Sequence, residues 1–435
     1  MSRLFGTDGI RGIFNQDLTE ELAYKVGKVL GQKYSGQKFL IVRDTRESGE
    51  PLQKALVSGL MESDLTILLA GVLPTPAAAL LTKKLECLAV VISASHNPYQ
   101  YNGIKILKLG YKLPDEEEDE IQKIIENLDL RASRHLKGKI LEFPEAEEIY
   151  VQAIKKMYEN IDFRGLKIAV DAANGSAYKT TPRVLRELGL KVDVYANNPD
   201  GRNINDGCGS LHPSFLARYV YDYDLGILHD GDADRCILLT PGGKEINGDK
   251  IMGITAVRMK QEGRLSNDTV VGTIMSNVGL ESFLTERGIK FLRTKVGDKY
   301  VLEKMLEVGA NLGGERSGHI IFLDRSTTGD GLITALEFLS TMVKLGKNAN
   351  ELEQLVLDFP QVMINVEVED KSVAESEELS KEVALLRKPG YRIVIRPSGT
   401  EKVIRIMVEG PDEKWISATA NHLAELVKSL DSRRG

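Results

Sequence analysis

Short apolar runs alternate with helical patterns along the first part of the chain. Residues 39–42, 66–69 and 88–92 have the apolar, β-branched composition of buried strands, and a helical pattern occupies residues 53–61 between the first two. This alternation is typical of βαβ units in a layered α/β sheet. Because the chain has 435 residues and a single hydrophobic core seldom grows past ~250, we expect several such domains.

The alternation recurs twice before the tail departs from it. A second α/β unit begins with an expected strand at residues 166–170, and a third carries expected strands at residues 269–274 and 319–322. Beyond residue 360, three expected strands and two expected helices suggest a small α+β domain. We therefore predict three consecutive α/β domains with mixed sheets and a C-terminal α+β domain, arranged around a central cleft. The predicted domains are residues 1–148, 149–248, 249–360 and 361–435.

Charge and cysteine content restrict the partners of the chain. Lysine and arginine number 57 and aspartate and glutamate 63, so the net charge of −6 provides no overall basic field for nucleic acid. No uninterrupted apolar stretch approaches the ~20 residues of a membrane-spanning helix, and the first residues lack the apolar core of a leader. Cys87, Cys208 and Cys236 are odd in number and widely spaced, which argues against a disulfide framework and a zinc site. We expect a cytoplasmic protein without nucleic-acid or membrane partners.

A serine-rich turn follows the expected strand at residues 88–92. Residues 93–98 read Ser-Ala-Ser-His-Asn-Pro, and Asn97 with Pro98 ends regular strand pairing. The hydroxyl of Ser95 can then face a cleft, where it can act as a nucleophile. Asn-Pro turns are common, so a purely structural turn is the alternative for this segment taken alone.

Three carboxylates are concentrated in one tight loop further along the chain. Asp230, Asp232 and Asp234 lie between two expected apolar strands. Carboxylates packed this closely repel one another without a counter-ion, and hard oxygen ligands suit Mg²⁺. A calcium EF-hand is excluded, because Arg235 and Pro241 stand where that loop requires glycine and glutamate. The sequence therefore predicts a magnesium site here, with a solvated acidic turn as the alternative.

Three further glycine-containing loops offer groups for a phosphorylated sugar. The loop at residues 313–319 brings together a carboxylate, a hydroxyl and an imidazole, which suit sugar hydroxyls. The loop at residues 396–400 has an arginine, two hydroxyls and a glycine, which suit a phosphate. Near the start, the loop at residues 6–12 contains Arg11 as a candidate active-site cation. Each loop alone is also consistent with an ordinary turn, but with the serine and aspartate loops they indicate a phosphosugar ligand.

Taken in order, these loops resemble those of the α-D-phosphohexomutase family. The family's serine loop, Asp-Gly-Asp-x-Asp-Arg metal loop, Gly-Glu-x-Ser-Gly-His sugar loop and Arg-x-Ser-Gly-Thr phosphate loop all occur, and the match covers essentially the whole chain. Within the family, residues 4–12, the doubled glycine before Glu315 and residues 405–410 are most similar to the bacterial branch that acts on glucosamine phosphates. Further matches to that branch are residues 203–205, 208–210 and 327–331.

The resemblance implies a phosphoserine mechanism. Ser95 is expected to carry a phosphoryl group in the resting enzyme. Asp230, Asp232 and Asp234 are expected to hold one Mg²⁺ per chain together with an oxygen of that phosphoryl group on Ser95. The residues implied to surround the transferred phosphoryl group and to assist proton movement are Arg11, His96 and Lys105, and Arg235 is implied to bind the substrate.

The resemblance also implies how the ligand is held. Lys295 is expected to help position it from the third domain. The side chains expected to hold the sugar hydroxyls are Glu315, Ser317 and His319. The residues expected to clamp the phosphate that is not reacting are Arg396, Ser398, Gly399 and Thr400.

The implied activity is the interconversion of glucosamine 6-phosphate and glucosamine 1-phosphate through a 1,6-bisphosphate, feeding UDP-N-acetylglucosamine synthesis. A hexose 1,6-bisphosphate is expected as a catalytic activator, and a homodimer is expected because members of the family often dimerise. A mutase for mannose or glucose phosphates stays open, because Arg316 stands where the glucosamine branch is expected to have glutamine. Alternatives of another class are a phosphosugar-binding protein without turnover and a phosphatase. A phosphatase that uses Asp230 and Asp232 would leave Ser95 without a role.

Overall fold

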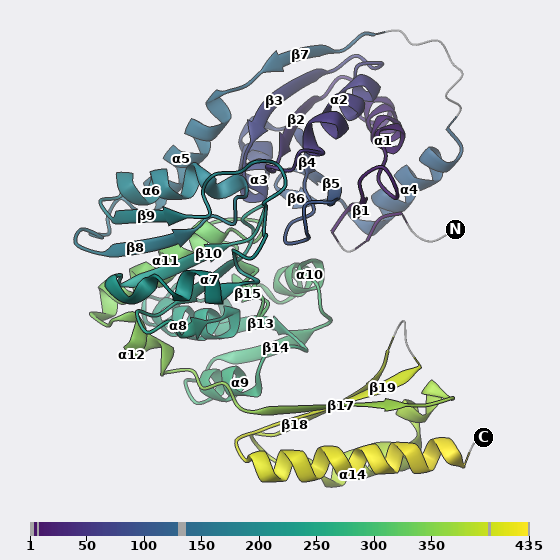
Figure 1. Ribbon diagram of the computed structural model, residues 1–435, viewed down its shortest axis with the longest axis vertical. Helices are drawn as coiled ribbons and strands as arrows, with labels where there is room; N and C mark the ends of the chain where they lie inside the picture. Colours follow the sequence, from purple (N-terminus) through teal and green to yellow (C-terminus); the bar gives the residue numbers. More distant parts are fainter. Residues whose placement is uncertain (1–3, 7, 129–135, 399–401, 434–435) are drawn as a thin grey trace. The chain divides into compact units, whose positions relative to one another are not determined.

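The computed structural model describes residues 4–6, 8–128, 136–398 and 402–433 of the chain (Figure 1). The chain divides into two compact units. The first contains Met1–Met275 and Leu292–Leu355, and the second contains Ser276–Phe291 and Val356–Gly435. The mixed α/β sheets followed by an α+β tail confirm the predicted fold class. The four domain boundaries stay a prediction.

The first sheet combines parallel and antiparallel strands. Its strands are β1 (Ile10–Ile13), β2 (Lys38–Arg43), β3 (Thr66–Val72), β4 (Leu88–Ile92), β5 (Tyr101–Lys108), β6 (Tyr111–Lys112) and β7 (Lys139–Glu142). Their order is β1-β5-β4-β2-β3-β7, with β6 paired to β5. β2 runs parallel to β3 and β4, whereas β5 is antiparallel to β1 and β4. The three strands expected first from the sequence are therefore β2, β3 and β4.

Helices cover both faces of this sheet. Successive side chains of a strand point to opposite faces. On β2, Phe39 and Ile41 join the hydrophobic core that includes residues of α1, α2 and α4, whereas Leu40 and Val42 are buried on the face where α3 contacts β2 and β4. The helices are α1 (Glu20–Lys33), α2 (Gly49–Leu60), α3 (Thr75–Leu85), α4 (Asp115–Glu126) and α5 (Glu145–Tyr158), the last of which contacts α3.

The second sheet carries the predicted metal loop at a hairpin turn. Its strands are β8 (Lys167–Asp171), β9 (Lys191–Tyr195), β10 (Leu225–His229), β11 (Cys236–Leu239) and β12 (Glu245–Ile246), in the order β12-β11-β10-β8-β9. β8 is parallel to β9 and β10, whereas β10 and β11 are antiparallel, so residues 230–235 form the turn between them. The associated helices are α6 (Thr180–Glu187) and α7 (Pro213–Ala217), with 3-10 turns η1 (Ser176–Tyr178) and η2 (Val220–Asp222).

The third sheet carries the predicted sugar loop at another hairpin turn. Its strands are β13 (Thr269–Thr273), β14 (Lys290–Thr294), β15 (Leu312–Gly314) and β16 (Ile320–Phe322), in the order β14-β13-β15-β16. β15 and β16 are antiparallel, so residues 315–319 form the turn between them. The helices are α8 (Gly248–Gln261), α10 (Asp298–Val308), α11 (Gly331–Leu345) and α12 (Ala349–Glu353), with the 3-10 turn η3 (Ser266–Asp268).

The second unit is a small antiparallel sheet with helices. Its strands are β17 (Gln361–Glu367), β18 (Arg392–Pro397) and β19 (Val403–Glu409), in the order β17-β19-β18. Its helices are α9 (Val278–Thr285), α13 (Glu377–Leu385) and α14 (Glu413–Ser432), with the 3-10 turn η4 (Lys371–Glu375). α14 packs against β17 and β19 through one apolar face. The side chain of Asn277, just before α9, exchanges two 3.0 Å hydrogen bonds with the backbone of Phe359.

Two observations concern the environment of the chain. Cys87, Cys208 and Cys236 are buried, unpaired thiols, and burial raises the pKa of Cys87 to about 11. Across the described residues, no helix combines the length and the apolar composition needed to cross a bilayer.

Candidate active site

Ser95 lies in a tight turn shortly after β4. Its backbone adopts a left-handed conformation with φ of 53°, and the residue is buried. The Ser95 hydroxyl donates a 2.6 Å hydrogen bond to Oδ2 of Asp230, and Nδ1 of His96 lies 3.4 Å from the same hydroxyl oxygen. Burial, followed by the nearby Arg235 and Arg11 cations, lowers the pKa of His96 to about 4, so its imidazole is neutral at pH 7. The turn thus presents a hydroxyl to a carboxylate beside a neutral ring.

One buried arginine holds the carbonyl groups of this turn. Arg46 donates to the carbonyl oxygens of Ser95 and Asn97 at 2.8 Å each, and to that of Pro98 at 2.5 Å. The side-chain amide of Asn205 adds hydrogen bonds of 3.0 and 3.2 Å to the first two carbonyls. Hydrogen bonds from a charged donor are stronger than neutral ones. They therefore help to stabilise the left-handed backbone at Ser95, which L residues otherwise disfavour.

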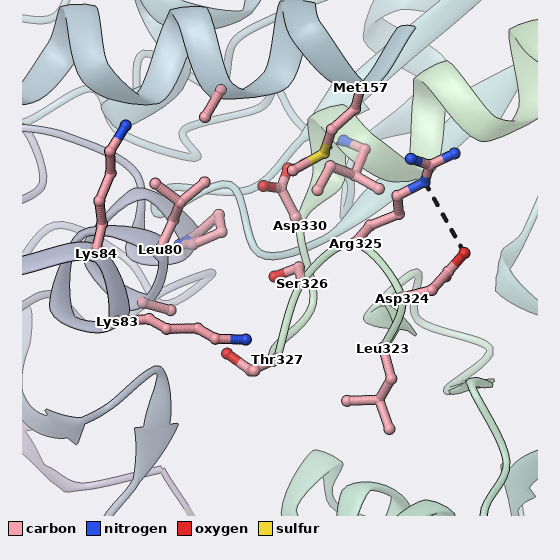
Figure 2. A pocket seen from close by; sticks show the side chains of 14 residues that line it. Leu80, Lys83, Lys84, Met157, Leu323, Asp324, Arg325, Ser326, Thr327 and Asp330 are labelled. Atoms are coloured by element: carbon pink, nitrogen blue, oxygen red, sulfur yellow. Dashed lines mark hydrogen bonds and ion pairs between the residues drawn. The ribbon is translucent and has the colours of Figure 1, made fainter.

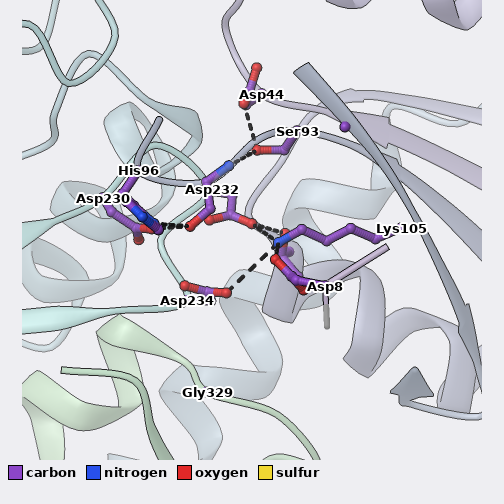
Figure 3. Close-up of polar contacts among 12 residues, drawn as sticks. Asp8, Asp44, Ser93, His96, Lys105, Asp230, Asp232, Asp234 and Gly329 are labelled. Atoms are coloured by element: carbon purple, nitrogen blue, oxygen red, sulfur yellow. Dashed lines mark hydrogen bonds and ion pairs between the residues drawn. The ribbon is translucent and has the colours of Figure 1, made fainter. Parts of the chain in front are cut away.

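Asp44 completes this support and was not predicted from the sequence. Its Oδ2 accepts a 2.9 Å hydrogen bond from Nε of Arg46 and a 2.6 Å hydrogen bond from the Ser93 hydroxyl. The Ser93 oxygen in turn accepts the N–H of Ser95 at 3.0 Å (Figure 3). Asp44 and Arg46 are both about 1% exposed. The available signal was their position directly after the buried strand β2, where charged residues are expected to be solvated or functional.

The three loop aspartates converge at the turn between β10 and β11. Carboxylate oxygens of Asp230, Asp232 and Asp234 lie within 4.8 Å of one another, and all three residues are buried. Oδ1 of Asp232 and Oδ1 of Asp234 accept no hydrogen bond within the described part of the chain. Buried carboxylate oxygens without partners are energetically costly. The cluster can therefore hold a metal ion, and its oxygen-only donor set fits a hard cation such as Mg²⁺.

Repulsion within the cluster changes how it titrates. Burial, followed by the charges of Asp234 and Asp232, raises the pKa of Asp230 to about 8. Arg235 and the hydrogen bond from Ser95 act in the opposite direction but are outweighed. Without a cation, the cluster therefore keeps a proton at neutral pH. A bound cation would compete with that proton for the same oxygens.

The first residues of two helices hold the metal loop. Thr75 at the start of α3 donates its N–H to the Asp232 carbonyl at 3.0 Å and its hydroxyl to Asp232 Oδ2 at 2.6 Å. Gly331 at the start of α11 donates its N–H to the Ala233 carbonyl at 3.0 Å. Ala233 has a left-handed φ of 57°. The loop is thus fixed by contacts from segments far away in sequence.

Lys105 is buried behind the metal loop. Its Nζ lies 2.8 Å from Asp8 Oδ2 and 2.7 Å from Asp232 Oδ2 (Figure 3). Burial alone would lower the pKa of Lys105, but the charges of Asp232 and Asp8 raise it, so the ammonium stays protonated. Asp8 also pairs with Arg11 and, at 2.5 Å, with Lys112. Asp8 and Lys112 were not predicted as site residues, although Asp8 lies in the glycine-containing loop around Arg11.

A cavity of about 210 Å³ brings seven of the predicted residues together, whereas Asp230 and Asp232 are not among the residues that line it. The predicted residues that line it are Arg11, Ser95, His96, Asp234, Arg235, Glu315 and His319. Residues that line it without having been predicted are Asp8, Lys112, Val296, Gly297 and Asp298. Lys105, Lys295 and Ser317 are not among the lining residues, and the last two are exposed. The serine turn, metal loop and sugar loop therefore meet at one cavity.

The sugar loop is joined to the metal loop. Nδ1 of His319 lies 3.5 Å from Oδ2 of Asp234, and the Gly329 N–H donates a 3.2 Å hydrogen bond to Nε2 of His319. Burial lowers the pKa of His319, but the charges of Asp234 and Asp298 outweigh it and raise that pKa to about 9. The carboxylates thus favour the cationic ring, whereas the bond from Gly329 requires an unprotonated Nε2. Glu315 accepts the N–H of Gly297 at 2.9 Å through Oε1. His319 therefore contacts a metal-loop carboxylate, and its expected contact with sugar hydroxyls stays a prediction.

Arg316, the residue that departs from the expected pattern, is directed toward α8. Its Nη1 lies 3.4 Å from Oδ2 of Asp249, and its side chain is 40% exposed. Its backbone carbonyl accepts the N–H of Gly248 at 3.0 Å. Arg316 is not among the residues that line the 210 Å³ cavity.

The predicted phosphate loop belongs to the second compact unit and is described in part. Arg396 lies in β18 and is half-buried. The Ser398 N–H donates to the Val403 carbonyl at 2.8 Å, and Lys371 Nζ donates to the Ser398 carbonyl at 2.9 Å. Gly399 and Thr400 lie outside the described residues.

Family models match nearly the whole chain. They describe phosphoglucomutase/phosphomannomutase α/β/α domains I, II and III at residues 2–132, 148–243 and 247–359, and the C-terminal domain of the same family at residues 363–426. The phosphoglucosamine mutase of Thermosipho africanus is 49% identical over 432 residues, which cover 99% of this chain and 100% of that protein. The phosphoglucosamine mutase of Thermotoga maritima is 50% identical over 427 residues, which cover 98% and 99% of the two chains.

Solved structures share the fold at lower identity. A phosphoglucomutase/phosphomannomutase family protein from Burkholderia thailandensis has a TM-score of 0.82 at 23% identity, covering 99% of this chain and 98% of the other. N-acetylphosphoglucosamine mutase from Aspergillus fumigatus, in complex with GlcNAc-6P and magnesium, has a TM-score of 0.66 at 17% identity, covering 98% and 96%. The chain therefore belongs to the phosphoglucomutase/phosphomannomutase family of phosphohexomutases.

Proposed function

We propose that this enzyme interconverts glucosamine 6-phosphate and glucosamine 1-phosphate, as a phosphoglucosamine mutase. The observation that carries the proposal is the hydrogen bond from Ser95 to Asp230, which joins the expected phosphoserine to the aspartate cluster. Two relatives of that name, each about half identical over nearly the whole chain, support the substrate. A mutase for mannose or glucose phosphates is the alternative within the family.

One Mg²⁺ per chain fits the aspartate cluster. The residues that would hold it are Asp230, Asp232 and Asp234, with an oxygen of the phosphoryl group on Ser95. The two partnerless oxygens on Asp232 and Asp234 support this assignment. When bound, Mg²⁺ supplies positive charge that offsets the charge of the phosphoryl oxygens during transfer.

The proposed first step moves a phosphoryl group from Ser95 to a sugar hydroxyl. The bond between Ser95 Oγ and phosphorus breaks, and a bond between phosphorus and the sugar oxygen forms. The hydroxyl proton passes to neutral His96, whose Nδ1 lies 3.4 Å from Ser95 Oγ, and from there to the departing Oγ, which becomes the serine hydroxyl. The product is a 1,6-bisphosphate, whose other phosphate returns to Ser95 after the sugar turns over. A free hexose 1,6-bisphosphate would prime Ser95 in the same way. Arg11 and Arg235 line the cavity and would offset phosphate charge.

Lys105 is assigned a positioning role in this scheme. It is buried and paired with Asp8 and Asp232, so it would act through those carboxylates and not by touching the sugar. Its positive charge lowers the repulsion that a doubly charged phosphoryl group would meet from the aspartate cluster.

The remaining assignments concern how the ligand is held. Glu315 and His319 line the cavity, which supports contacts with sugar hydroxyls, and exposed Ser317 and Lys295 are assigned to ligand binding by family resemblance alone. The residues assigned to the distal phosphate are Arg396, Ser398, Gly399 and Thr400.

Four separately matched family models support the proposed domains. Three unpaired cysteines support the proposed cytoplasmic location.

The test is a direct assay of mutase turnover. Glucosamine 6-phosphate, mannose 6-phosphate and glucose 6-phosphate are each supplied with Mg²⁺ and a catalytic amount of glucose 1,6-bisphosphate, and kcat/KM is compared. We expect glucosamine 6-phosphate to have the highest kcat/KM and the Ser95→Ala variant to be inactive with every sugar. A higher kcat/KM for mannose or glucose phosphate would replace the substrate but keep the mechanism. Turnover by Ser95→Ala at the wild-type rate would overturn the mechanism.

A further inference from the structure

A second cavity, of about 300 Å³, lies between α3, α5 and the segment that leads from β16 to α11. We call it the α3–α5 cavity. Figure 2 shows Leu80 and Lys83 on one wall, Met157 on another, and the segment containing Thr327 on a third. The α3–α5 cavity shares no lining residue with the 210 Å³ cavity at Ser95. It is therefore a separate site, and the proposed reaction gives it no role.

The lining combines apolar surface with unpaired positive charge. Leu80, Met157 and Leu323 provide apolar contact, and Lys83 and Lys84 stand at the rim. Neither lysine has a carboxylate partner within the described residues, and the ammonium group of Lys83 is directed toward Thr327 (Figure 2). Other lysines on the surface of the same unit do have such partners, for example in the Lys54–Glu50 and Lys155–Glu187 pairs.

The acidic groups at the cavity already have partners in the protein. Asp324 pairs with Arg264 at 2.6 Å. Asp330 accepts the Tyr150 hydroxyl at 2.9 Å and two backbone N–H groups at the start of α11. Burial raises the pKa of Asp330 to about 6, so its carboxylate is still mostly ionised at pH 7. Arg325, the third basic residue of the lining, pairs with Glu337 at 3.3 Å. Lys83 and Lys84 are therefore the lining cations left to meet an anionic ligand.

We propose that the α3–α5 cavity binds a small organic anion and thereby regulates the metal loop. The ligand class is an apolar body, aliphatic or aromatic, that carries one anionic group. The anionic group lies at Lys83, whose ammonium group is directed toward Thr327, and Lys84 adds positive charge at the rim (Figure 2). The apolar body lies against Leu80, Met157 and Leu323.

Two walls of the cavity lead directly to the metal loop. α3 begins at Thr75, which donates two hydrogen bonds to Asp232. The opposite segment continues to Gly329, which donates to His319, and to Gly331, which donates to Ala233. A ligand bound between α3 and the opposite segment therefore affects two sets of contacts at the same time, those of Thr75 with Asp232 and those of the opposite segment with the metal loop.

The segment that forms the opposite wall is tightly packed against His319 and the metal loop at Gly329. A Cβ atom built on Gly329 would lie 2.6 Å from His319 Nε2 and 2.7 Å from the Asp234 carbonyl. Closely packed segments move together or not at all. The anion and a cation at the aspartate cluster therefore change each other's affinity, and by linkage they do so by the same factor.

The binding test uses naphthalene-2-sulfonate, measured by isothermal titration calorimetry on the full chain. Inorganic sulfate tests charge alone, and 2-naphthol tests apolar contact alone. We expect one naphthalene-2-sulfonate per chain, bound at least ~10-fold more tightly than either control. Equal or tighter binding of 2-naphthol would overturn the role of the two lysines.

Two variants locate the bound probe. Lys83→Ala/Lys84→Ala should weaken binding about 10-fold, whereas the matched double variant Lys137→Ala/Lys139→Ala, which also removes two exposed charges, should not. Ala153→Phe places a ring in the cavity from α5 and should abolish binding, with an unchanged thermal unfolding midpoint as the check on folding. Binding that survives both cavity variants would overturn the proposed site.

The coupling is tested by repeating the titration with Mg²⁺. Saturating Mg²⁺ should change the dissociation constant of naphthalene-2-sulfonate by about 5-fold or more, and the change should vanish in Asp232→Asn. The reciprocal titration of Mg²⁺, with and without the probe, must give the same factor. Mg²⁺ binding that is identical in both titrations would overturn the regulatory role. A chain that binds no Mg²⁺ at all would instead contradict the metal site of the proposed function.

Discussion

The serine turn and the metal loop are neighbours joined by one hydrogen bond, yet they are built on opposite principles. In the serine turn, Arg46 and Asn205 together donate five hydrogen bonds. The acceptors are the carbonyl groups of Ser95, Asn97 and Pro98. In the metal loop, the buried Oδ1 atoms of Asp232 and Asp234 accept no hydrogen bond from the described residues. The turn is satisfied by the protein, whereas the loop is left to be satisfied by a ligand.

This difference gives the serine turn a fixed backbone and the metal loop a readiness to bind a cation. A nucleophile must keep its position through two phosphoryl transfers, which favours a fully hydrogen-bonded backbone. A cation site must gain free energy when the ion binds, which favours carboxylates that repel one another beforehand. Substitutions in the supports of the turn should therefore reduce stability, and substitutions in the loop should reduce activity.

The largest expected effect is on activity, in Asp230→Asn. We expect kcat/KM to fall about 10³-fold, because the variant loses a charged oxygen that faces both Ser95 and the cation site. Because the pKa of Asp230 is raised to about 8, the residue is mostly protonated at pH 7 without metal, and asparagine mimics that form. The urea midpoint of the metal-free variant should therefore match wild type. A large loss of stability would erase the contrast with the serine turn.

The largest expected effect on stability is in Arg46→Ala. The substitution leaves Asp44 as a buried carboxylate without its ionic partner and removes three hydrogen bonds from the turn. Breaking a buried ion pair in this way costs about 3–5 kcal/mol. Urea unfolding measures the loss. The matched control is Arg202→Ala, which breaks a surface pair with Glu47 and should cost less than about 1 kcal/mol.

The pH dependence of stability should distinguish the loop from the turn. The pKa of Asp230 in the folded chain, about 8, is above its ordinary value, so its protonation stabilises the metal-free fold at low pH and this contribution is lost as pH rises toward 8. The thermal midpoint of wild type in a chelator should therefore decline between pH 5 and pH 8. Asp230→Asn should show a smaller decline. Parallel pH profiles for the two proteins would count against the assignment.

The smallest expected effect is in Thr75→Val. The substitution keeps the shape of the side chain but removes its 2.6 Å hydrogen bond to Asp232, and a bond to a charged group is worth about 2 kcal/mol. Thr75→Ser retains the hydroxyl and should restore most of the loss. Because Thr75 connects α3 to the metal loop, Mg²⁺ affinity is the second readout. An unchanged affinity in Thr75→Val would show that this contact supports the fold alone.

Local patterns in the sequence were sufficient for many of the elements and for the two loops that follow strands. They did not predict β5, and Arg11, expected in a loop at residues 6–12, lies in β1. The apolar run at residues 88–92 is β4, and the aspartate loop follows β10, because strand composition and turn residues act over short distances. Arg46 was missed because the carbonyl groups that it holds lie about 50 residues away, so its neighbours in the sequence do not show what it contacts. Lys105 projects from β5 into a buried pair with Asp8 and Asp232, a pairing that was not expected from the sequence, and its expected place near the phosphoryl group stays a prediction. Such long-range pairing is fixed by strand register, which one sequence does not encode locally.

The division of the chain has a consequence for how such a protein can be cut and recombined. The backbone passes between the two compact units three times, after residues 275, 291 and 355. A stop codon at residue 360 would remove the tail sheet but leave α9 behind. Ser276, just before α9, would then lose the 3.0 Å hydrogen bond that Arg392 donates to its carbonyl oxygen. Swapping the tail between relatives would thus require a second crossover around residues 276–291. The second unit is therefore made of two separate segments, residues 276–291 and 356–435, which would have to be exchanged together.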